Sequence, residues 1–590
     1  MSETADLRAR QREIVLKMLR STGDDDGSWR VLVFDKVGME VLSPIVKVKE
    51  LRDAGVTLHL GIDSTRQPLP GVPAIYFCEP TPDNIARIAD DAKNELYQRM
   101  DVNFIAQIPR EQLEMLAGLL AGVPNISSLR VFDRTLSYVA LDPGLFHLTM
   151  RDTFKQLHSS KADEADVDKI LNRAVLGLGH VFMTNGALPV VAHVRSGPAT
   201  ELAERTTRHL TDLMKERMIP SNQSGSRPLL LIVDRSYDFT APLHHPFSYR
   251  GLLSDSLGMR LNKVDVVVQG QKKTSELDPD NDTFWAENAT KPFNEVSHNV
   301  EEALGNYKRE YKAVTEADGG ATIDDGSADA VTKMLALAPK LAERKRYLDA
   351  HTNIAFAALN EIKQRELDVF HGVEEALLRR EELDREAFVR LLKTSDSTKA
   401  TDMDRLRLYL IAKLLSEDEQ AAFVDEQQTL VSPAGKVAAL QFIKSMQAWS
   451  VPGAAGGSSQ EASGWRIAQT LSKNFAKAFT ASESFTPLPL TRLLEAIVSH
   501  QRGSSVQMRE RNKVLESVVA QDPRTPGTLV DMSTAKFPFV YVFVLAGGCM
   551  TEYDNIKQCE RTCNNVAYGC TEMLTGSDFL AQLNELGASA

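Results

Sequence analysis

Two aspartates, an arginine and two adjacent histidines follow a run of apolar residues in LLLIVDRSYDFTAPLHH, residues 229–245. Asp234 and Arg235 stand where a strand of a parallel sheet would end, which is where α/β proteins often place reactive side chains. An enzyme that uses Asp234, Arg235 and His244 is therefore one interpretation. In the alternative, Asp234, Arg235 and Asp238 bind the backbone and each other at a buried junction, because an unpaired buried charge is costly.

The same stretch does not indicate a metal site. His244 and His245 are neighbours, so their side chains cannot easily face one ion together as residues i and i+4 of a helix can. Three clustered cysteines lack a nearby histidine that would complete a zinc site: Cys559, Cys563 and Cys570. The chain also has no Walker A, GxGxxG, GxSxG or HExxH motif. We therefore expect no catalytic residue, no metal and no cofactor.

Short apolar runs alternate with amphipathic stretches between residues 31 and about 140, ahead of the charged cluster in the chain. This rhythm is typical of βαβ units and predicts a parallel sheet covered on both faces. The predicted strands are 31–35, 56–61, 74–77 and 103–108, and the predicted helices are 84–99 and 110–121.

Strand-like runs return at 189–194, 229–234 and 539–547, separated by a mostly helical segment from about 251 to 484. The last run, FVYVFVLAG, resembles a buried parallel strand and needs partners. Pairing it with the two earlier runs gives a second α/β domain that is discontinuous in sequence, with the helical segment inserted. Two stretches rich in small and polar residues, 315–329 and 450–464, are predicted loops.

Size and charge restrict the class of protein. A chain of 590 residues is expected to form three or four domains, at roughly 100–200 residues each. The net charge of −12 and the lack of a basic stripe argue against a nucleic-acid partner. The longest apolar run, 537–550, is shorter than the roughly 20 residues of a membrane-spanning helix. The five cysteines show no CxxC spacing and are expected to be reduced thiols in the cytosol.

The stretch LLLIVDRSYDFTAPLHHPFSYRGLLSDSLG resembles the signature of the SM (Sec/Munc) family, cytosolic proteins that assist SNARE assembly before membrane fusion. Four further blocks are similar to the Sly branch of that family, which serves ER–Golgi traffic, and the five fall in family order between about residues 7 and 585. These blocks are WRVLVFDKVGMEVLSPIVKVKELRDAGVTLHLGI, DTFWAEN…FNEVSHNVEEAL, LAERKRYLDAHTNIAFAALNEIKQRELDVF and YVFVLAGGCMTEYDNI…YGCTEML.

The resemblance implies a three-domain arch made of two parallel-sheet α/β domains and a large helical insertion domain. Its expected limits are 1–138 for domain 1, 139–250 and 485–590 for the discontinuous domain 2, and 251–484 for helical domain 3, which carries a SNARE-binding hairpin.

The function implied is that of a non-enzymatic chaperone that templates and proofreads SNARE complexes for vesicle docking and fusion. The expected partners are a syntaxin-type Qa-SNARE of the ER and Golgi, other SNAREs including an R-SNARE, assembled SNARE complexes and tethering factors. We expect a cytoplasmic monomer that is held peripherally, through SNAREs, on ER, Golgi and transport-vesicle membranes.

The resemblance also places a pocket for the N-terminal peptide of the syntaxin on domain 1. LEMLAG matches the pocket helix of the family and carries Leu113, Leu116 and Ala117, which occupy positions i, i+3 and i+4 of one helix face. Val131 matches further on, and Ile126 or Leu129 supplies the remaining wall. A stripe with this spacing is also typical of an ordinary core. If the pocket exists, Leu116→Lys should abolish peptide binding with little change in melting temperature.

Two alternatives remain open. An SM protein of a vacuolar, endosomal or exocytic step would differ in the syntaxin that it binds. An α/β enzyme would turn over a small molecule. If the chain is an SM protein, Asp234, Arg235, Asp238 and His244 form a structural junction of domain 2.

Overall fold

The computed structural model describes most of the chain, in eleven segments. They are 6–20, 29–123, 128–194, 197–220, 227–316, 328–393, 399–432, 437–449, 485–498, 511–559 and 561–589.

A five-stranded parallel sheet follows the N-terminal helix α1 (Leu7–Arg20), in the strand order β2-β1-β3-β4-β5. This confirms the parallel sheet expected for the first part of the chain. Its strands are β1 (Arg30–Phe34), β2 (Val56–Gly61), β3 (Ala74–Cys78), β4 (Met100–Phe104) and β5 (Leu129–Asp133), and its helices are α2 (Lys36–Leu42), α3 (Val48–Asp53), α4 (Pro82–Lys93) and α5 (Arg110–Leu119).

One strand of this sheet differs in position from its prediction. The expected strand at 103–108 begins at Met100 and ends at Phe104. The carboxylate of Asp101 is buried in it and accepts a bond of 2.5 Å from Arg130 on β5. Because the second residue of the strand is charged and its partner lies on another strand, the apolar pattern did not mark the start of β4.

A seven-stranded sheet has the order β12-β8-β9-β13-β15-β7-β6. The last apolar run forms β13, which pairs in parallel with β9 from Val540 opposite Leu229 onwards, so the predicted long-range pairing is confirmed. Two pairs at the edges, β12 with β8 and β6 with β7, are antiparallel. The strands are β6 (Val139–Asp142), β7 (Leu145–His147), β8 (Val190–Val194), β9 (Leu229–Asp234), β12 (Val518–Gln521), β13 (Val540–Leu545) and β15 (Val566–Cys570).

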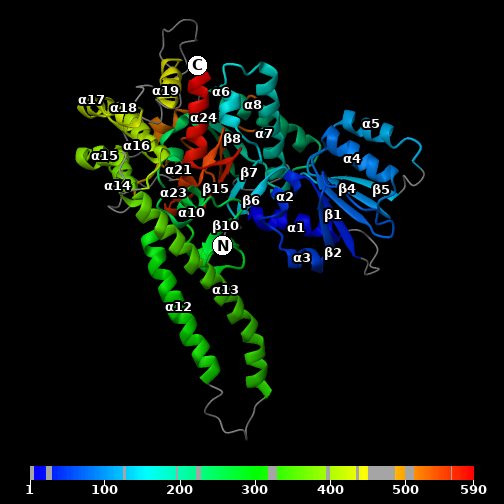
Figure 1. Ribbon diagram of the computed structural model, residues 1–590. Helices are drawn as coiled ribbons and strands as arrows, with labels where there is room; N and C mark the ends of the chain where they lie inside the picture. The colour runs from blue at the N-terminus through cyan, green and yellow to red at the C-terminus, as the bar shows by residue number, and fades with distance from the viewer. Residues whose placement is uncertain are drawn as a thin grey trace.

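Helices from residues 153–215 and from the C-terminal part of the chain pack around this second sheet (Figure 1). They are α6 (Thr153–His158), α7 (Glu164–Asn185), α8 (Gly197–Lys215), α23 (Met550–Gln558) and α24 (Gly576–Ser589), and a two-stranded sheet of β14 (Gly548–Cys549) and β16 (Met573–Leu574) lies beside them.

The segment between β9 and β12 is mainly helical, as expected, and also holds a hairpin of β10 (Lys263–Val268) and β11 (Gln271–Glu276). Its helices are the 3₁₀ turn η2 (Arg235–Tyr237), α9 (Thr240–Leu243), α10 (Tyr249–Ser256), α11 (Thr283–Asn288), α12 (Phe293–Glu316), α13 (Ala328–Arg365), α14 (Leu367–Leu378), α15 (Arg385–Leu392), α16 (Asp402–Leu415), α17 (Asp418–Glu426), α18 (Gln428–Val431), α19 (Ala438–Trp449) and α21 (Pro489–Val498).

The long helices α12 and α13 lie side by side and project from the body as an arm (Figure 1). Pro339 lies inside α13, which continues through it. Most of the predicted loop 315–329 and the whole of the predicted loop 450–464 lie outside the described residues.

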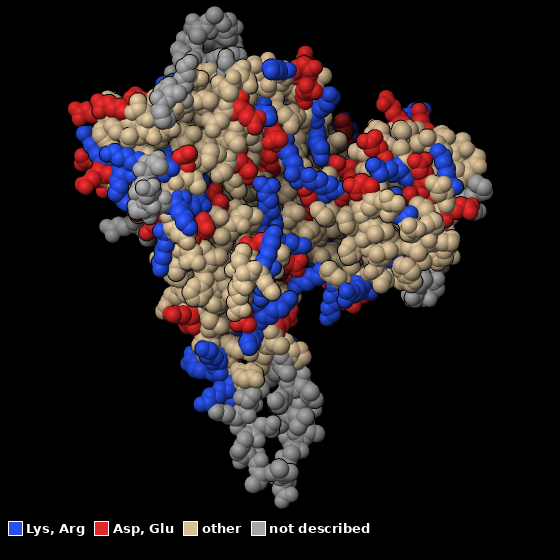
Figure 2. Space-filling model, in the orientation of Figure 1, with Lys and Arg blue, Asp and Glu red and all other residues tan. Residues whose placement is uncertain are grey.

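Among the described residues, no helix combines the length and the apolar character that crossing a membrane requires. Acidic and basic side chains are interspersed on the face of the molecule drawn in Figure 2.

Candidate functional site: an apolar surface on the first sheet and a buried charged junction

The predicted pocket helix is α5, which packs beside α4 over the five-stranded sheet. The three residues of the predicted stripe differ in exposure. Leu113 is 45% exposed and Ala117 is also exposed, whereas Leu116 is 2% exposed and lies in the core with Leu120. Leu113 and Ala117 are four residues apart and therefore share the outer side of the helix. Leu116 supports this surface from below.

The expected wall of the pocket comes from β5, the edge strand beside β4. Leu129 and Val131 are half-buried and pack against the same core as Leu116, so the structure brings these three residues together. Ile126 lies outside the described residues.

Two features of this region were not predicted. Met115 on α5 is 38% exposed, and the guanidinium of Arg134 stacks over the ring of Phe132 at 4.6 Å. Strand periodicity could have marked Phe132, because it alternates with Val131 along β5. The result is a partly exposed apolar surface on α5 next to a sheet edge with an aromatic residue and a positive charge.

The charged residues of the 229–245 stretch lie at the carboxyl end of β9, and all are buried. Asp234 caps η2 by accepting from the backbone N–H of Ser236 at 2.8 Å. Asp238 accepts from the backbone N–H and the hydroxyl of Thr240 at 2.8 and 2.6 Å. Both carboxylates therefore serve local backbone structure.

Arg235 links the end of β9 to α23. It donates to both oxygens of Glu552 on α23, at 2.6 and 2.9 Å, and each side chain is 1% exposed. It also donates to the carbonyl oxygen of Asp238 at 2.6 Å. Burial alone would lower the pKa of Arg235, but the charge of Glu552 outweighs it and the pKa is raised. The guanidinium is thus a permanent cation with a dedicated partner.

The two adjacent histidines have different neighbours. The ring of His245 lies 2.6 Å from Glu374 of α14 through Nδ1 and 3.3 Å from Asp404 of α16 through Nε2. Burial opposes its charge, but these carboxylates prevail and raise the pKa of His245. Burial lowers the pKa of His244 to about 4, and this ring lies near His371 and Glu375, with Glu374 at 3.9 Å from its Nε2. His244 and His245 therefore do not face a common ion.

A cavity of about 150 Å³ lies beside His244 and is bordered by α14, α23 and the segment before α21. One serine, Ser248, borders this cavity, and its hydroxyl donates to the carboxylate of Asp554 at 2.6 Å.

Comparisons with known proteins agree over almost the whole chain. The Sec1 family pattern matches residues 30–582. The SEC1 family transport protein SLY1 of Arabidopsis thaliana is 32% identical over 98% of this chain and 96% of its own length. Protein sly1 of Schizosaccharomyces pombe is 30% identical over 95% of this chain and 93% of its own length.

Solved structures show the same fold. A crystal structure of Sly1p in complex with an N-terminal peptide of Sed5p is 25% identical, with a TM-score of 0.78 over 99% of both chains. The Unc18–syntaxin 1 complex from Monosiga brevicollis is 18% identical, with a TM-score of 0.74 over 99% of this chain and 100% of that one. The arrangement of two parallel-sheet units and a helical arm is therefore that of the SM arch, and the chain belongs to the Sec1 family.

Proposed function

We propose that this chain is a Sly-type SM protein that binds a syntaxin-type Qa-SNARE and templates SNARE assembly in ER–Golgi transport. The observation that carries this proposal is the full-length likeness to Sly1p, a protein solved with an N-terminal peptide of Sed5p. Relatives with the SLY1 name align over nearly their entire length as well.

The surface of α5 fits a short peptide. Leu113 and Ala117 offer exposed apolar area over a core that contains Leu116, Leu129 and Val131. An apolar peptide side chain would cover Leu113 there, and full burial of a leucine contributes roughly 1.5–3 kcal/mol. Because 45% of Leu113 is exposed, covering it contributes about 1 kcal/mol, so several such contacts are needed for tight binding.

The domain limits belong to this proposal: 1–138, 139–250 with 485–590, and 251–484. The first sheet ends at Asp133, the second begins at Val139, and β12, β13 and β15 rejoin it after the helical segment. The arm of α12 and α13 is the proposed SNARE-binding hairpin. The protein acts as a non-enzymatic monomer held at ER, Golgi and vesicle membranes by its SNARE partners, including R-SNAREs, and by tethering factors.

Calorimetry with synthetic N-terminal peptides from a panel of syntaxins tests the proposal on the purified full chain. We expect one ER–Golgi syntaxin peptide to bind, and Leu113→Lys to weaken it by at least tenfold because a charge is placed against the apolar peptide. Leu58→Lys is the matched control, since Leu58 is a 36% exposed leucine on β2 at the opposite edge of the same sheet.

Two results would contradict different parts of the proposal. Unaltered peptide affinity in Leu113→Lys would refute the assignment of the peptide-binding surface to α5. Failure of the wild-type chain to bind any full-length syntaxin or SNARE complex would remove the SNARE function as a whole.

A further inference from the structure

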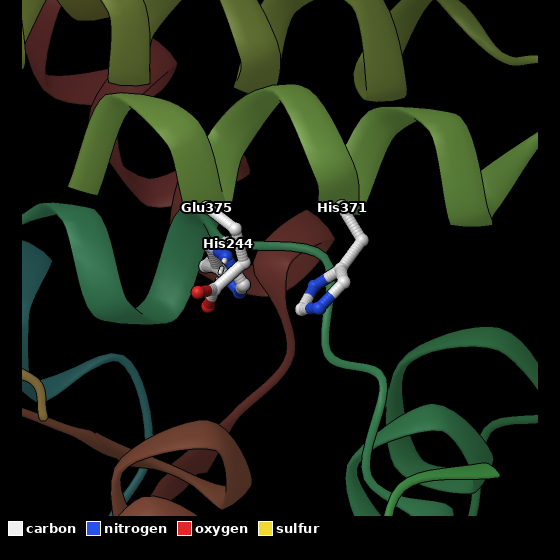
Figure 3. A group of neighbouring side chains, drawn as sticks. All are labelled: His244, His371 and Glu375. Atoms are coloured by element: carbon white, nitrogen blue, oxygen red, sulfur yellow. Dashed lines mark ion pairs between the residues drawn. The ribbon is translucent and has the colours of Figure 1, made fainter. Parts of the chain in front are cut away.

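We propose that His244, His371 and Glu375 form a binding site for a divalent transition-metal ion, with Zn²⁺ the best match to the donor atoms (Figure 3). Such an ion would join the segment that follows α9 to helix α14. This inference does not depend on SNARE binding.

The three side chains converge from two segments that are distant in sequence. His371 and Glu375 are residues i and i+4 of α14 and project from the same side of the helix toward His244 (Figure 3). One potential ligand atom from each residue lies within 4.8 Å of the other two. Ligand atoms around a tetrahedral zinc with bonds of about 2.0–2.1 Å lie roughly 3.4 Å apart. Side-chain rotations that move the ligand atoms by about 1 Å would therefore close the site.

His244 is a buried side chain whose ring nitrogens make no hydrogen bond within the described residues. It is 4% exposed. The nearest carboxylate oxygen, from Glu375, lies 3.7 Å from Nε2, beyond hydrogen-bond range. Buried polar atoms in native proteins are nearly always satisfied, so this imidazole is expected to bind a group that the protein chain does not supply.

His371 makes the kind of hydrogen bond that usually supports a histidine ligand. Its Nδ1 lies 2.9 Å from the carbonyl oxygen of His245, which can only accept, so Nδ1 carries the proton. That bond leaves Nε2 with a free lone pair, and a hydrogen bond of this kind from the other nitrogen is the common support of a histidine ligand. The ring also stacks on Phe247, with centroids 5.2 Å apart.

Glu375 is held in a similar way. One of its oxygens is 3.4 Å from the guanidinium of Arg379, which leaves the other oxygen on the side of His244. Arg379 is fixed in turn by a bond of 2.7 Å to the hydroxyl of Thr486.

The donor set and the cavity define the ion. Two imidazole nitrogens and one carboxylate oxygen suit Zn²⁺, whereas Ca²⁺ and Mg²⁺ prefer oxygen ligands alone. The cavity of about 150 Å³ beside the cluster has room for a water as the fourth ligand, since a water occupies roughly 30 Å³ in the liquid.

Zinc titration of the full chain, first stripped with a chelator, tests this site by calorimetry and by metal analysis after dialysis. We expect one Zn²⁺ per chain, and a loss of affinity of at least tenfold in both His371→Asn and Glu375→Gln. These two positions are only partly buried, so the variants should fold, which their melting temperatures without metal would verify. The matched control is His298→Asn, because His298 is an exposed histidine on α12.

Two further readouts separate this site from other metal binding. Zn²⁺ should raise the melting temperature of the wild type but not that of His371→Asn, because an ion that binds only the folded state stabilises it. Co²⁺ in place of Zn²⁺ should give visible bands without a thiolate charge-transfer band. The proposal is overturned if both variants keep the wild-type affinity, if the thiolate band shows cysteine binding instead, or if the wild type retains no ion.

Discussion

Replacing Glu552 by glutamine tests whether the charged residues after β9 hold the fold together. The side chain keeps its shape, but Arg235 loses the charge that offsets its burial. Both groups are 1% exposed, and breaking a buried ion pair on one side costs about 3–5 kcal/mol. For an unfolding unit of 150–250 residues each kcal/mol shifts the melting temperature by about 2–4 °C, so we expect a loss of about 10 °C.

Differential scanning fluorimetry of a double-mutant cycle measures this effect. Arg235→Met combined with Glu552→Gln removes the unpaired cation, so the double variant should lose less than the sum of the two single losses. Glu114→Gln is the control, because its pair with Arg110 on α5 is exposed and should leave the melting temperature unchanged. An unchanged melting temperature in Glu552→Gln, or strictly additive losses, would refute the structural role of the pair.

Three further changes have expected outcomes in the same assay. Leu116→Lys should lower the free energy of unfolding by at least about 3 kcal/mol, because Leu116 is 2% exposed in the core. A preserved melting temperature would show that the lysine side chain can turn out of the core into solvent. Burial lowers the pKa of His147 to about 4 from about 6.5 in the unfolded chain, so its contribution to stability is complete above pH 6.5 and is lost as pH falls toward 4. His147→Asn should therefore lose less stability than the wild type between pH 7.5 and pH 5, and an identical loss would exclude this histidine as the cause. A Cβ on Gly587 would overlap the backbone carbonyl of Ala438, so Gly587→Ala should separate α24 from α19 and cost about 1–3 kcal/mol, whereas full stability would show that the two helices slide without cost.

The sequence predicted the sheets well where strands are uniformly apolar. Val540 to Leu545 is buried at every position and pairs with β9, as its unbroken run of apolar residues indicated. The prediction from sequence failed where a buried charge has its partner on another strand, as for Asp101 near the start of β4 and Arg130 on β5. The reason is that single-sequence periodicity contains no information on cross-strand pairs.

The predicted pocket shows a second limit. The spacing of Leu113, Leu116 and Ala117 correctly defined a helix, but it could not say which of the three residues faces the core. The expectation that Leu116→Lys would leave the melting temperature unchanged therefore does not agree with the burial of Leu116. A stripe of i, i+3 and i+4 spans an arc of the helix, and its two sides can have different environments.

The partners of the histidines could not be predicted at all. His371 and Glu374 lie within a single turn of α14, yet the ring of His371 packs against the ring of His244, whereas the carboxylate of Glu374 binds the ring of His245. Which histidine meets which residue depends on how α14 docks on the segment after α9, and this docking is set by contacts between segments far apart in the chain.

The buried contacts of the 229–245 stretch together explain why it contains so many charged residues. At its start Arg235 binds α23, and at its end His245 binds Glu374 of α14. Arg407 of α16 donates to the carbonyl oxygens of Leu243 and His244, at 2.7 and 2.9 Å. One short segment thus connects the second sheet to α14, which directly follows the arm in the chain, and to α16. Because each contact is charged and desolvated, rotation of these helices away from the sheet would expose several unpaired groups at once. The helices α14 and α16, which follow the arm in the chain, are therefore tied to the second sheet through this one segment.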